Sequence, residues 1–346
     1  EVTFTSEYQY DSNGNITKQT YPSGYAITNS YTNGYLTKVE GSNGDKIWEF
    51  GSETALGQPI SYKLGNSVTV THSYNQDMHL TGIKTGTALD YSYSFNATTG
   101  NLSWRKDNKT NLQENFTYDN LNRLEKVSMG SHQQLIRYEK NGNISYKDDA
   151  GMYTYTGYKV TGINSSSNNI PSATQETAFN GFGKIDSIAE GAASIRFVYG
   201  TDRQRIKSVE RQGTTTTTRY YTASHEREVT ATGTTDRSYI YSPYGLAAVV
   251  EIKGDTYTTL LVSTDHLGSI VGLFTPNGNL VQKLSYDAWG NLRNPADYSQ
   301  PFAETPRLRR GFTGHEHEPL FGIINMNGRL YDPVLGRFLS PDPYVQ

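Results

Sequence analysis

Short runs of alternating apolar and polar residues recur along the chain, separated by turns rich in Gly and Asn. In the clearest example, Tyr10-Asp11-Ser12-Asn13-Gly14-Asn15-Ile16 separates residues 8–10 from residues 16–20, and both flanking runs alternate. Strict alternation is typical of half-buried strands, while Asn-Gly and Asp-x-x-Gly tolerate the positive φ of tight turns. The pattern predicts a β-hairpin.

The same phrase repeats along most of the chain. Its shared features are an aromatic residue, Asp or Asn, two variable residues, Gly, Asn and an apolar residue, and further copies begin at Tyr31, Phe50, Tyr74, Phe95, Tyr118, Tyr138, Tyr155, Phe179, Tyr199, Tyr221, Tyr241 and Tyr286. Consecutive copies are mostly spaced by roughly 17 to 24 residues, a length that one hairpin fills. The sequence therefore predicts an all-β fold of serial β-hairpins with little helix.

Two stretches depart from the hairpin pattern. Residues 174–179 are the best candidate for a short helix, and the Ser- and Asn-rich residues 164–174 are expected to form a surface loop.

A hairpin repeat buries its apolar face only against neighbours, so the first unit is expected to expose an edge that a preceding repeat would cover. The start at Glu1-Val2-Thr3, without Met or a signal pattern, suggests a boundary inside a larger protein.

Composition narrows the class of protein. The 27 Tyr residues against 12 Phe suit half-buried sheet surface, because the ring is apolar and its hydroxyl needs a partner. A net charge of -3 gives no electrostatic case for a nucleic-acid partner or an anionic membrane. No apolar run is long enough to span a bilayer. The chain has no Cys, so disulfides and thiolate metal sites are excluded.

The last part of the chain differs from the repeats. Residues 328–343 read Gly-Arg-Leu-Tyr-Asp-Pro-Val-Leu-Gly-Arg-Phe-Leu-Ser-Pro-Asp-Pro, with two Asp-Pro pairs and two arginines. Upstream, Asp265-His266-Leu267-Gly268-Ser269 forms a second distinctive string.

These strings and the repeated phrase resemble the Rhs/YD-repeat family, which is related to the C component of Tc toxins and to teneurin YD shells. Residues 265–269 look like the start of the Rhs repeat-associated core, and residues 328–343 look like its end. The resemblance implies a β-ribbon spiralling into a shell or partial shell, with a repeat array over residues 1–262 and the core over residues 263–346. Tyr side chains are expected to stack from one turn of the ribbon to the next.

In that family, the core closes the shell and acts as an aspartyl autoprotease that releases an enclosed C-terminal toxin domain. The resemblance matches the family's essential Arg to Arg329 and its catalytic Asp to Asp342, with Asp332 as candidate for the second carboxylate. Two close carboxyls do not both ionise, so one becomes an acid and the other a base. The implied partners are the protein's own toxin domain and preceding shell repeats, and the implied location is secreted or at the bacterial cell surface. Because the chain stops at Gln346, we expect it to lack the cleavage site, which leaves enzyme activity of this chain open.

Simpler interpretations stand beside this one. Asp332-Pro333-Val334-Leu335-Gly336 is a good turn without any catalysis. His315 and His317 would share one face of a strand and could bind zinc, but the string lacks the H-E-x-x-H spacing, and a polar loop that hydrogen-bonds to the shell backbone is the preferred interpretation. No cofactor is expected. An alternative function is a non-enzymatic surface module that binds a glycan or a protein partner, with exposed Tyr or Trp48, Trp104 and Trp289 as stacking platforms.

Overall fold

The computed structural model describes residues 2–164 and 174–342, and most of these lie in antiparallel strands. The described ranges contain no α-helix and one 3-10 turn, Phe312–Gly314. The all-β prediction is confirmed. The helix predicted for residues 174–179 is wrong, because Gln175–Phe179 is a strand that pairs with Ile185–Glu190. Pairing within a sheet outweighs a weak local helix preference.

Two large sheets form the wall of the molecule, and in each sheet every strand pairs with the next in sequence. The sixteen-stranded sheet consists of β1 (Glu7–Tyr10), β2 (Ile16–Thr20), β3 (Ala26–Thr32), β4 (Tyr35–Gly41), β5 (Lys46–Glu53), β6 (Pro59–Leu64), β7 (Val68–Tyr74), β8 (Leu80–Thr85), β9 (Leu89–Phe95), β10 (Leu102–Asp107), β11 (Leu112–Tyr118), β12 (Leu124–Met129), β13 (His132–Tyr138), β14 (Ile144–Lys147), β15 (Gly151–Thr156) and β16 (Lys159–Asn164).

The eleven-stranded sheet completes the wall, and short strands follow it. The sheet consists of β17 (Gln175–Phe179), β18 (Ile185–Glu190), β19 (Ala193–Tyr199), β20 (Arg205–Gln212), β21 (Thr215–Tyr221), β22 (His225–Thr230), β23 (Gly233–Ser242), β24 (Gly245–Lys253), β25 (Thr256–Thr264), β26 (Ile270–Phe274) and β27 (Leu280–Lys283). Then come β28 (Ser285–Tyr286), β29 (Leu292–Arg293), β30 (Glu316–Glu318), β31 (Ile323–Asn325), β32 (Leu330–Asp332) and β33 (Arg337–Phe338).

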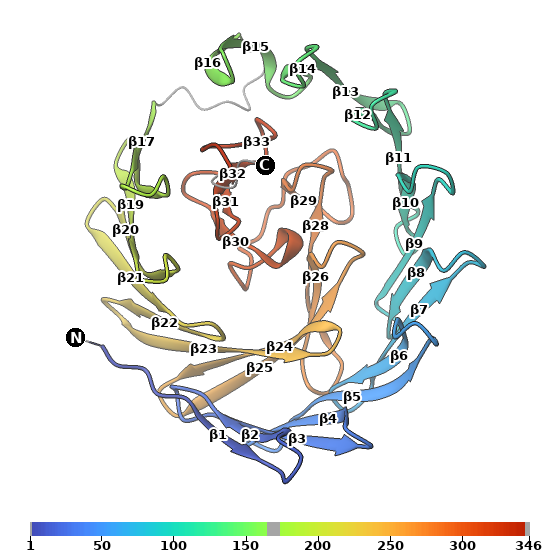
Figure 1. Cartoon of the computed structure of the whole chain (residues 1–346), viewed down its shortest axis with the longest axis vertical. Coiled ribbons are helices and arrows are strands. Elements are labelled where there is room, and N and C mark those ends of the chain that lie inside the picture. The colour runs from blue at the N-terminus through green and yellow to red at the C-terminus, as the bar shows by residue number, and fades with distance from the viewer. Residues whose placement is uncertain (1, 165–173, 343–346) are drawn as a thin grey trace.

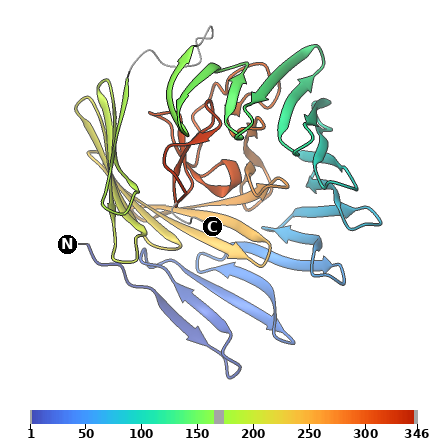
Figure 2. The same ribbon diagram turned by 45° about the horizontal axis from the view of Figure 1, so that its top comes forward.

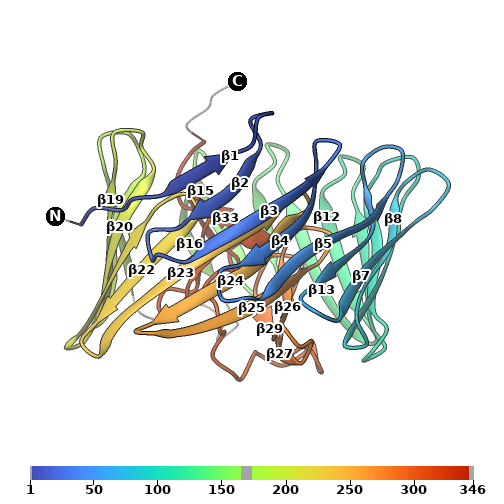
Figure 3. The same ribbon diagram turned by 90° about the horizontal axis from the view of Figure 1, so that it is seen from below.

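The wall curls into a ring rather than a flat sheet. Figure 1 shows the strands following one another around the ring, with β24 and β25 lying inside β3–β5 where the ribbon overlaps itself. Seen from below, the ring is a band of slanted strands, with the N-terminal strands in front of β22–β25 (Figure 3). This arrangement agrees with the predicted partial shell.

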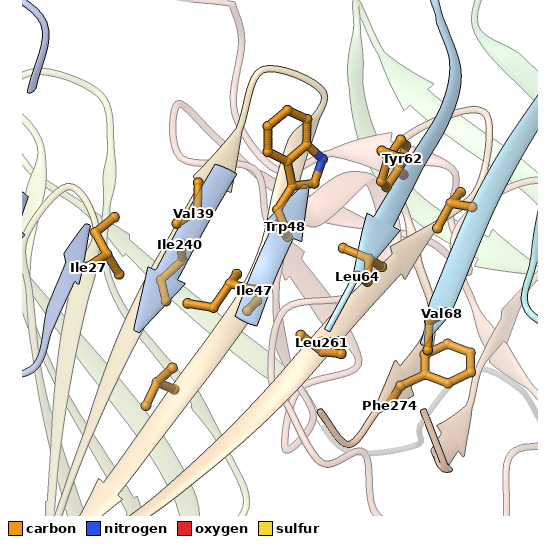
Figure 4. Close-up of a cluster of buried hydrophobic side chains, with 14 of the residues drawn as sticks. Ile27, Val39, Ile47, Trp48, Tyr62, Leu64, Val68, Ile240, Leu261 and Phe274 are labelled. Carbon is orange, nitrogen blue, oxygen red and sulfur yellow. The ribbon is translucent and has the colours of Figure 1, made fainter. Parts of the chain in front are cut away.

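The overlap is filled by the largest apolar cluster. Ile27, Val39, Trp48 and Leu64 of the outer layer pack with Ile240, Leu261 and Phe274 of the inner layer (Figure 4). Trp48 is only 1% exposed, so it belongs to this interface and is not available as a stacking platform for sugars. Face-to-face burial of two sheets gives the ring a thick, apolar side.

At six of the described turns, the repeated Asp or Asn closes the turn through its side chain. Asp11 Oδ1 accepts hydrogen bonds from the backbone N–H groups of Asn13 and Asn15, both at 2.9 Å. The same acceptor pattern, two and four residues ahead, occurs at Asn75, Asp119, Asn180, Asp265 and Asp287. Gly14 adopts a φ of +84° in the first of these turns, a conformation that costs Gly little.

The repeated Tyr ties one repeat to the previous one. Tyr31 Oη donates to the carbonyl of Ile16, the first residue of β2, at 3.0 Å. Equivalent bonds to the first residue of an earlier strand are made by Tyr74, Tyr118, Tyr138, Tyr155 and Tyr199, at 2.6–3.0 Å. The abundance of Tyr over Phe is therefore explained by a hydroxyl contact that recurs between neighbouring repeats.

Residues 284–342, here called the inner segment, lie inside the ring (Figures 1 and 2). Its apolar residues Phe321, Ile323 and Leu330 pack on the wall residues Ile188 and Phe197. The predicted boundary at residue 263 falls within β25, which pairs with β24 and β26, and the division into two domains stays a prediction. Most of the surface loop expected at residues 164–174 lies outside the described residues.

Candidate functional site

The structure brings Arg329 and Asp342 together. Arg329 Nη2 lies 3.0 Å from Asp342 Oδ2, and the Arg329 guanidinium stacks over the Phe338 ring at 3.8 Å. Arg329 directly precedes β32, and Phe338 belongs to β33, which pairs with it. Stacking on an aromatic face holds a guanidinium in place while leaving its N–H groups free to bind a carboxylate. The Asp342 side chain is 53% exposed, so solvent can reach it.

Asp332 lies in a different environment, at the end of β32. Its Oδ1 accepts a hydrogen bond from the Leu335 N–H at 2.9 Å, which closes the turn 332–336. Burial raises the pKa of Asp332, and Asp149 adds to this increase, while the turn's N–H groups and Lys147 oppose it. A carboxyl with a raised pKa is suited to hold a proton. Two charged neighbours of Asp332, Lys147 and Asp149, therefore come from the wall.

Lys147, the last residue of β14, is the centre of this second cluster. The side chain is fully buried, and its Nζ contacts Asp149 Oδ1 at 2.5 Å and the Val334 carbonyl at 3.0 Å. It also lies 5.1 Å from the Trp289 ring centroid. Burying a lysine is costly unless it is paired and hydrogen-bonded, as it is here.

Asp149 completes the cluster from the turn between β14 and β15. Burial raises its pKa, and Asp287 adds to this, against the lowering effect of Lys147. Sequence reasoning missed Lys147 and Asp149 because they lie in the repeat array. The available signal was the charged run Lys147-Asp148-Asp149 at a turn where most other repeats have Gly or Asn.

A larger ionic network joins the inner segment to β20 and β21. Arg205 pairs with Glu316, and its Nη1 lies 3.4 Å from Glu318 Oε1. Arg309 Nη2 lies 2.5 Å from Glu318 Oε2 and 2.9 Å from Glu210 Oε2. Burial alone would raise the pKa of Glu316, but Arg205 and Arg309 outweigh it and hold that pKa at about 2. Burial and the nearby Glu316 raise the pKa of Glu318 to about 7.

The two histidines considered for zinc make other contacts. His317 Nε2 accepts a hydrogen bond from the Phe312 N–H at 3.0 Å, and its ring lies 5.7 Å from that of Tyr286. His315 Nδ1 lies 2.8 Å from Thr313 Oγ1. Across residues 2–164 and 174–342, no group of three or more His, Cys, Asp or Glu side chains is arranged to hold a metal ion. The zinc interpretation gains no support from this geometry.

Comparison with known proteins identifies the family. The family model described as Teneurin YD-shell matches residues 66–346, which is most of the chain. The protein belongs to the Teneurin YD-shell family. The YD shell of this chain is also similar in structure to the Tc toxin complex TcdB2-TccC3, with a TM-score of 0.80 and 17% identity over 98% of this chain and 21% of that one.

Two curated relatives illustrate the range of proteins that are similar to this chain in sequence. The tRNA nuclease WapA of Bacillus subtilis (strain 168) is 24% identical over 261 residues, covering 75% of this chain and 10% of WapA. Human Teneurin-4 is 25% identical over 266 residues, covering 73% of this chain and 9% of that protein. The chain thus spans about a tenth of the length of these relatives. No helix in the described ranges is long and apolar enough to cross a membrane.

Proposed function

We propose that this YD shell is part of a secreted or surface-exposed bacterial toxin protein that encloses a C-terminal toxin domain and releases it by aspartyl autoproteolysis. The observation that carries the proposal is the Arg329–Asp342 ion pair, whose carboxylate is half exposed and whose guanidinium is held on Phe338. Both residues lie in the block that resembles the end of the Rhs core. The relatives WapA and the Tc toxin complex support a toxin context.

The chemistry requires a water, a base and an acid. Asp342, oriented by Arg329, would take a proton from the water as its oxygen attacks the peptide carbonyl carbon. Asp332, whose pKa is raised by burial, would give a proton to the departing amine nitrogen as the C–N bond breaks. The scissile peptide would have to reach both carboxyls. No cofactor is needed for this reaction.

The test is expression of the chain through the sequence encoded after Gln346. We expect a smaller C-terminal fragment on a denaturing gel, and its loss in Asp342→Asn and in Arg329→Met. Asp77→Asn, which changes an exposed carboxylate in a wall turn, serves as the matched control and should cleave normally. An Asp342→Asn chain that is cleaved like the unchanged protein would rule out this mechanism.

A second candidate function is a non-enzymatic cell-surface module. A groove with a volume of about 410 Å³ is lined by Tyr35, Leu36, Phe50, Pro243 and Tyr244, among others, and Tyr35 is 73% exposed. Its aromatic rings suit a glycan or a partner protein, and the similarity to Teneurin-4 is compatible with such a role. Binding of the chain to a glycan array, abolished by Tyr35→Ala, together with an uncleaved extended chain, would favour this function.

A further inference from the structure

The wall holds the turn that carries Asp332. Lys147 Nζ donates to the Val334 carbonyl at 3.0 Å, and Tyr153 Oη donates to the Leu335 carbonyl at 2.9 Å. Gly336 has a φ of +62°, and a Cβ at that position would lie 2.8 Å from the Trp289 ring. Two consecutive carbonyls and a close aromatic contact therefore fix the backbone of this turn.

Arg337 fixes the other end of the same turn. It pairs with Asp332 in the β32–β33 register. Its Nη1 donates to Asn143 Oδ1 at 3.3 Å and to Tyr155 Oη at 3.1 Å, and its Nη2 donates to the Tyr158 carbonyl at 3.1 Å. All three partners belong to the wall, around β14–β16. The turn is thus held along its length by one part of the ring.

The ionisable groups around Asp332 come from several elements. The wall contributes Lys147, Asp149 and Tyr153, the turn between β28 and β29 contributes Asp287, and β32 and β33 contribute Tyr331 and Arg337. Lys147 is the fully buried cation among them, and Asp149 is its carboxylate partner at 2.5 Å and 2.6 Å. These two residues act on Asp332 with opposite sign, because one is a cation and the other an anion.

We infer that Lys147 and Asp149 are positioning residues of the autoproteolytic site, so that the site is complete only when the inner segment is docked against β14–β15. This inference rests on the proposed function and adds how the cleavage is regulated. Away from the wall, Asp332 would lie in water as an ordinary ionised carboxylate. Docking removes that water and sets Lys147 and Asp149 beside the turn. Cleavage is thereby restricted to an assembled shell.

The test is the pH dependence of self-cleavage in the chain extended past Gln346. Lys147→Met removes the cation. In the plot of cleavage rate against pH, the limb that reports the titration of Asp332 should therefore move to higher pH. Asp149→Asn removes the anion and should move it to lower pH. We expect each shift to be about half a pH unit or more. If Lys147 and Asp149 had only a structural role, the two substitutions would slow cleavage without moving the midpoint of this limb in opposite directions.

Lys38 and Glu40 provide the matched control. They form a 2.7 Å pair with the same spacing in the sequence, and they lie in β4, away from the turn that carries Asp332. Lys38→Met and Glu40→Gln should leave the profile unchanged. Unshifted midpoints in both Lys147→Met and Asp149→Asn, or shifts of the same sign, would overturn this inference while leaving the proposed function standing. An unchanged chain that is not cleaved, or an Asp342→Asn chain that is, would overturn the proposed function and this inference with it.

Discussion

The wall and the inner segment hold their backbones by different means. A wall turn such as the one at Asp11 is closed by bonds to residues two and four positions ahead, and Tyr31 reaches back only 15 residues to Ile16. The inner segment depends on distant partners: Arg293 makes two bonds to Glu114, at 2.6 and 2.7 Å, across 179 residues. The wall repeats can therefore form locally, whereas the inner segment takes its position from the assembled wall.

The interface between the two regions also buries ionisable groups. Glu114, Arg205, Glu316 and Glu318 are all largely buried there, in pairs or larger groups. Wall-turn carboxylates such as Asp77 and Asp202 are instead exposed. A change of pH, or a substitution that removes one of these buried charges, should therefore separate the inner segment from the wall.

Acid should have the largest effect. The Arg residues around Glu316 and Glu114 hold both pKa values at about 2, below the ordinary 4.5, so the stability that these groups provide is lost as pH falls from 4.5 towards 2. Burial lowers the pKa of His266 and His317 from 6.5 to about 4, so further stability is lost as pH falls from 6.5 to 4. Glu318, with a pKa of about 7, opposes this trend between 7 and 4.5.

Because Glu114 and Glu316 pair with arginines across the boundary between the wall and the inner segment, the inner segment should detach before the wall hairpins unfold. Trp289 contacts both regions and would report detachment by fluorescence once Trp48 and Trp104 are replaced by Phe. Far-UV circular dichroism follows the wall strands. Fluorescence should change at a higher pH than the circular dichroism signal, and coincident transitions would contradict a separate docking step.

The difference between local and distant contacts also decides what could be predicted from the sequence. The hairpins, their turns and the all-β class follow from a repeated phrase whose Asp11 and Gly14 act within one turn. The Arg329–Asp342 pair was predictable from the C-terminal block and its family resemblance. The contact of Lys147 with Val334 was not, because it joins residues 187 positions apart, and the charged run 147–149 marks the turn without indicating its partner. The strand at Gln175–Phe179 was mistaken for a helix because its pairing partner, not its own sequence, determines its structure.

Arg205→Met should have the second largest effect. The substitution removes one of the two arginines that contact both Glu316 and Glu318, and with it a guanidinium 4.0 Å from the Tyr221 ring centroid. The two buried carboxylates would then share Arg309 alone, and breaking a buried ion pair costs about 3–5 kcal/mol, which urea denaturation would measure.

Two further variants test this explanation. Arg196→Met breaks an exposed pair with Asp186, at 3.7 Å, and should cost about 1 kcal/mol or less. Adding Glu318→Gln to Arg205→Met should recover part of the lost stability, because one buried charge is removed. An Arg205→Met protein as stable as Arg196→Met would show that the buried network does not hold the inner segment.

The smallest effects on stability are expected from removing single Tyr hydroxyls. Such Tyr→Phe substitutions compare the wall and the inner segment most directly. Tyr74→Phe removes a bond within the wall, to the Pro59 carbonyl at 2.9 Å, from a partly exposed side chain. Tyr153→Phe removes a bond of the same length to Leu335 in the inner segment, from a side chain that is 6% exposed. An unsatisfied buried carbonyl costs more than one that water can reach, so we expect about 1–2 kcal/mol for Tyr153 and about 0.5–1 kcal/mol for Tyr74. Hydrogen exchange would locate each loss: near Pro59 for Tyr74→Phe, and in the turn 332–336 for Tyr153→Phe. Faster exchange throughout the wall in Tyr153→Phe would instead mean that the inner segment also stabilises the ring.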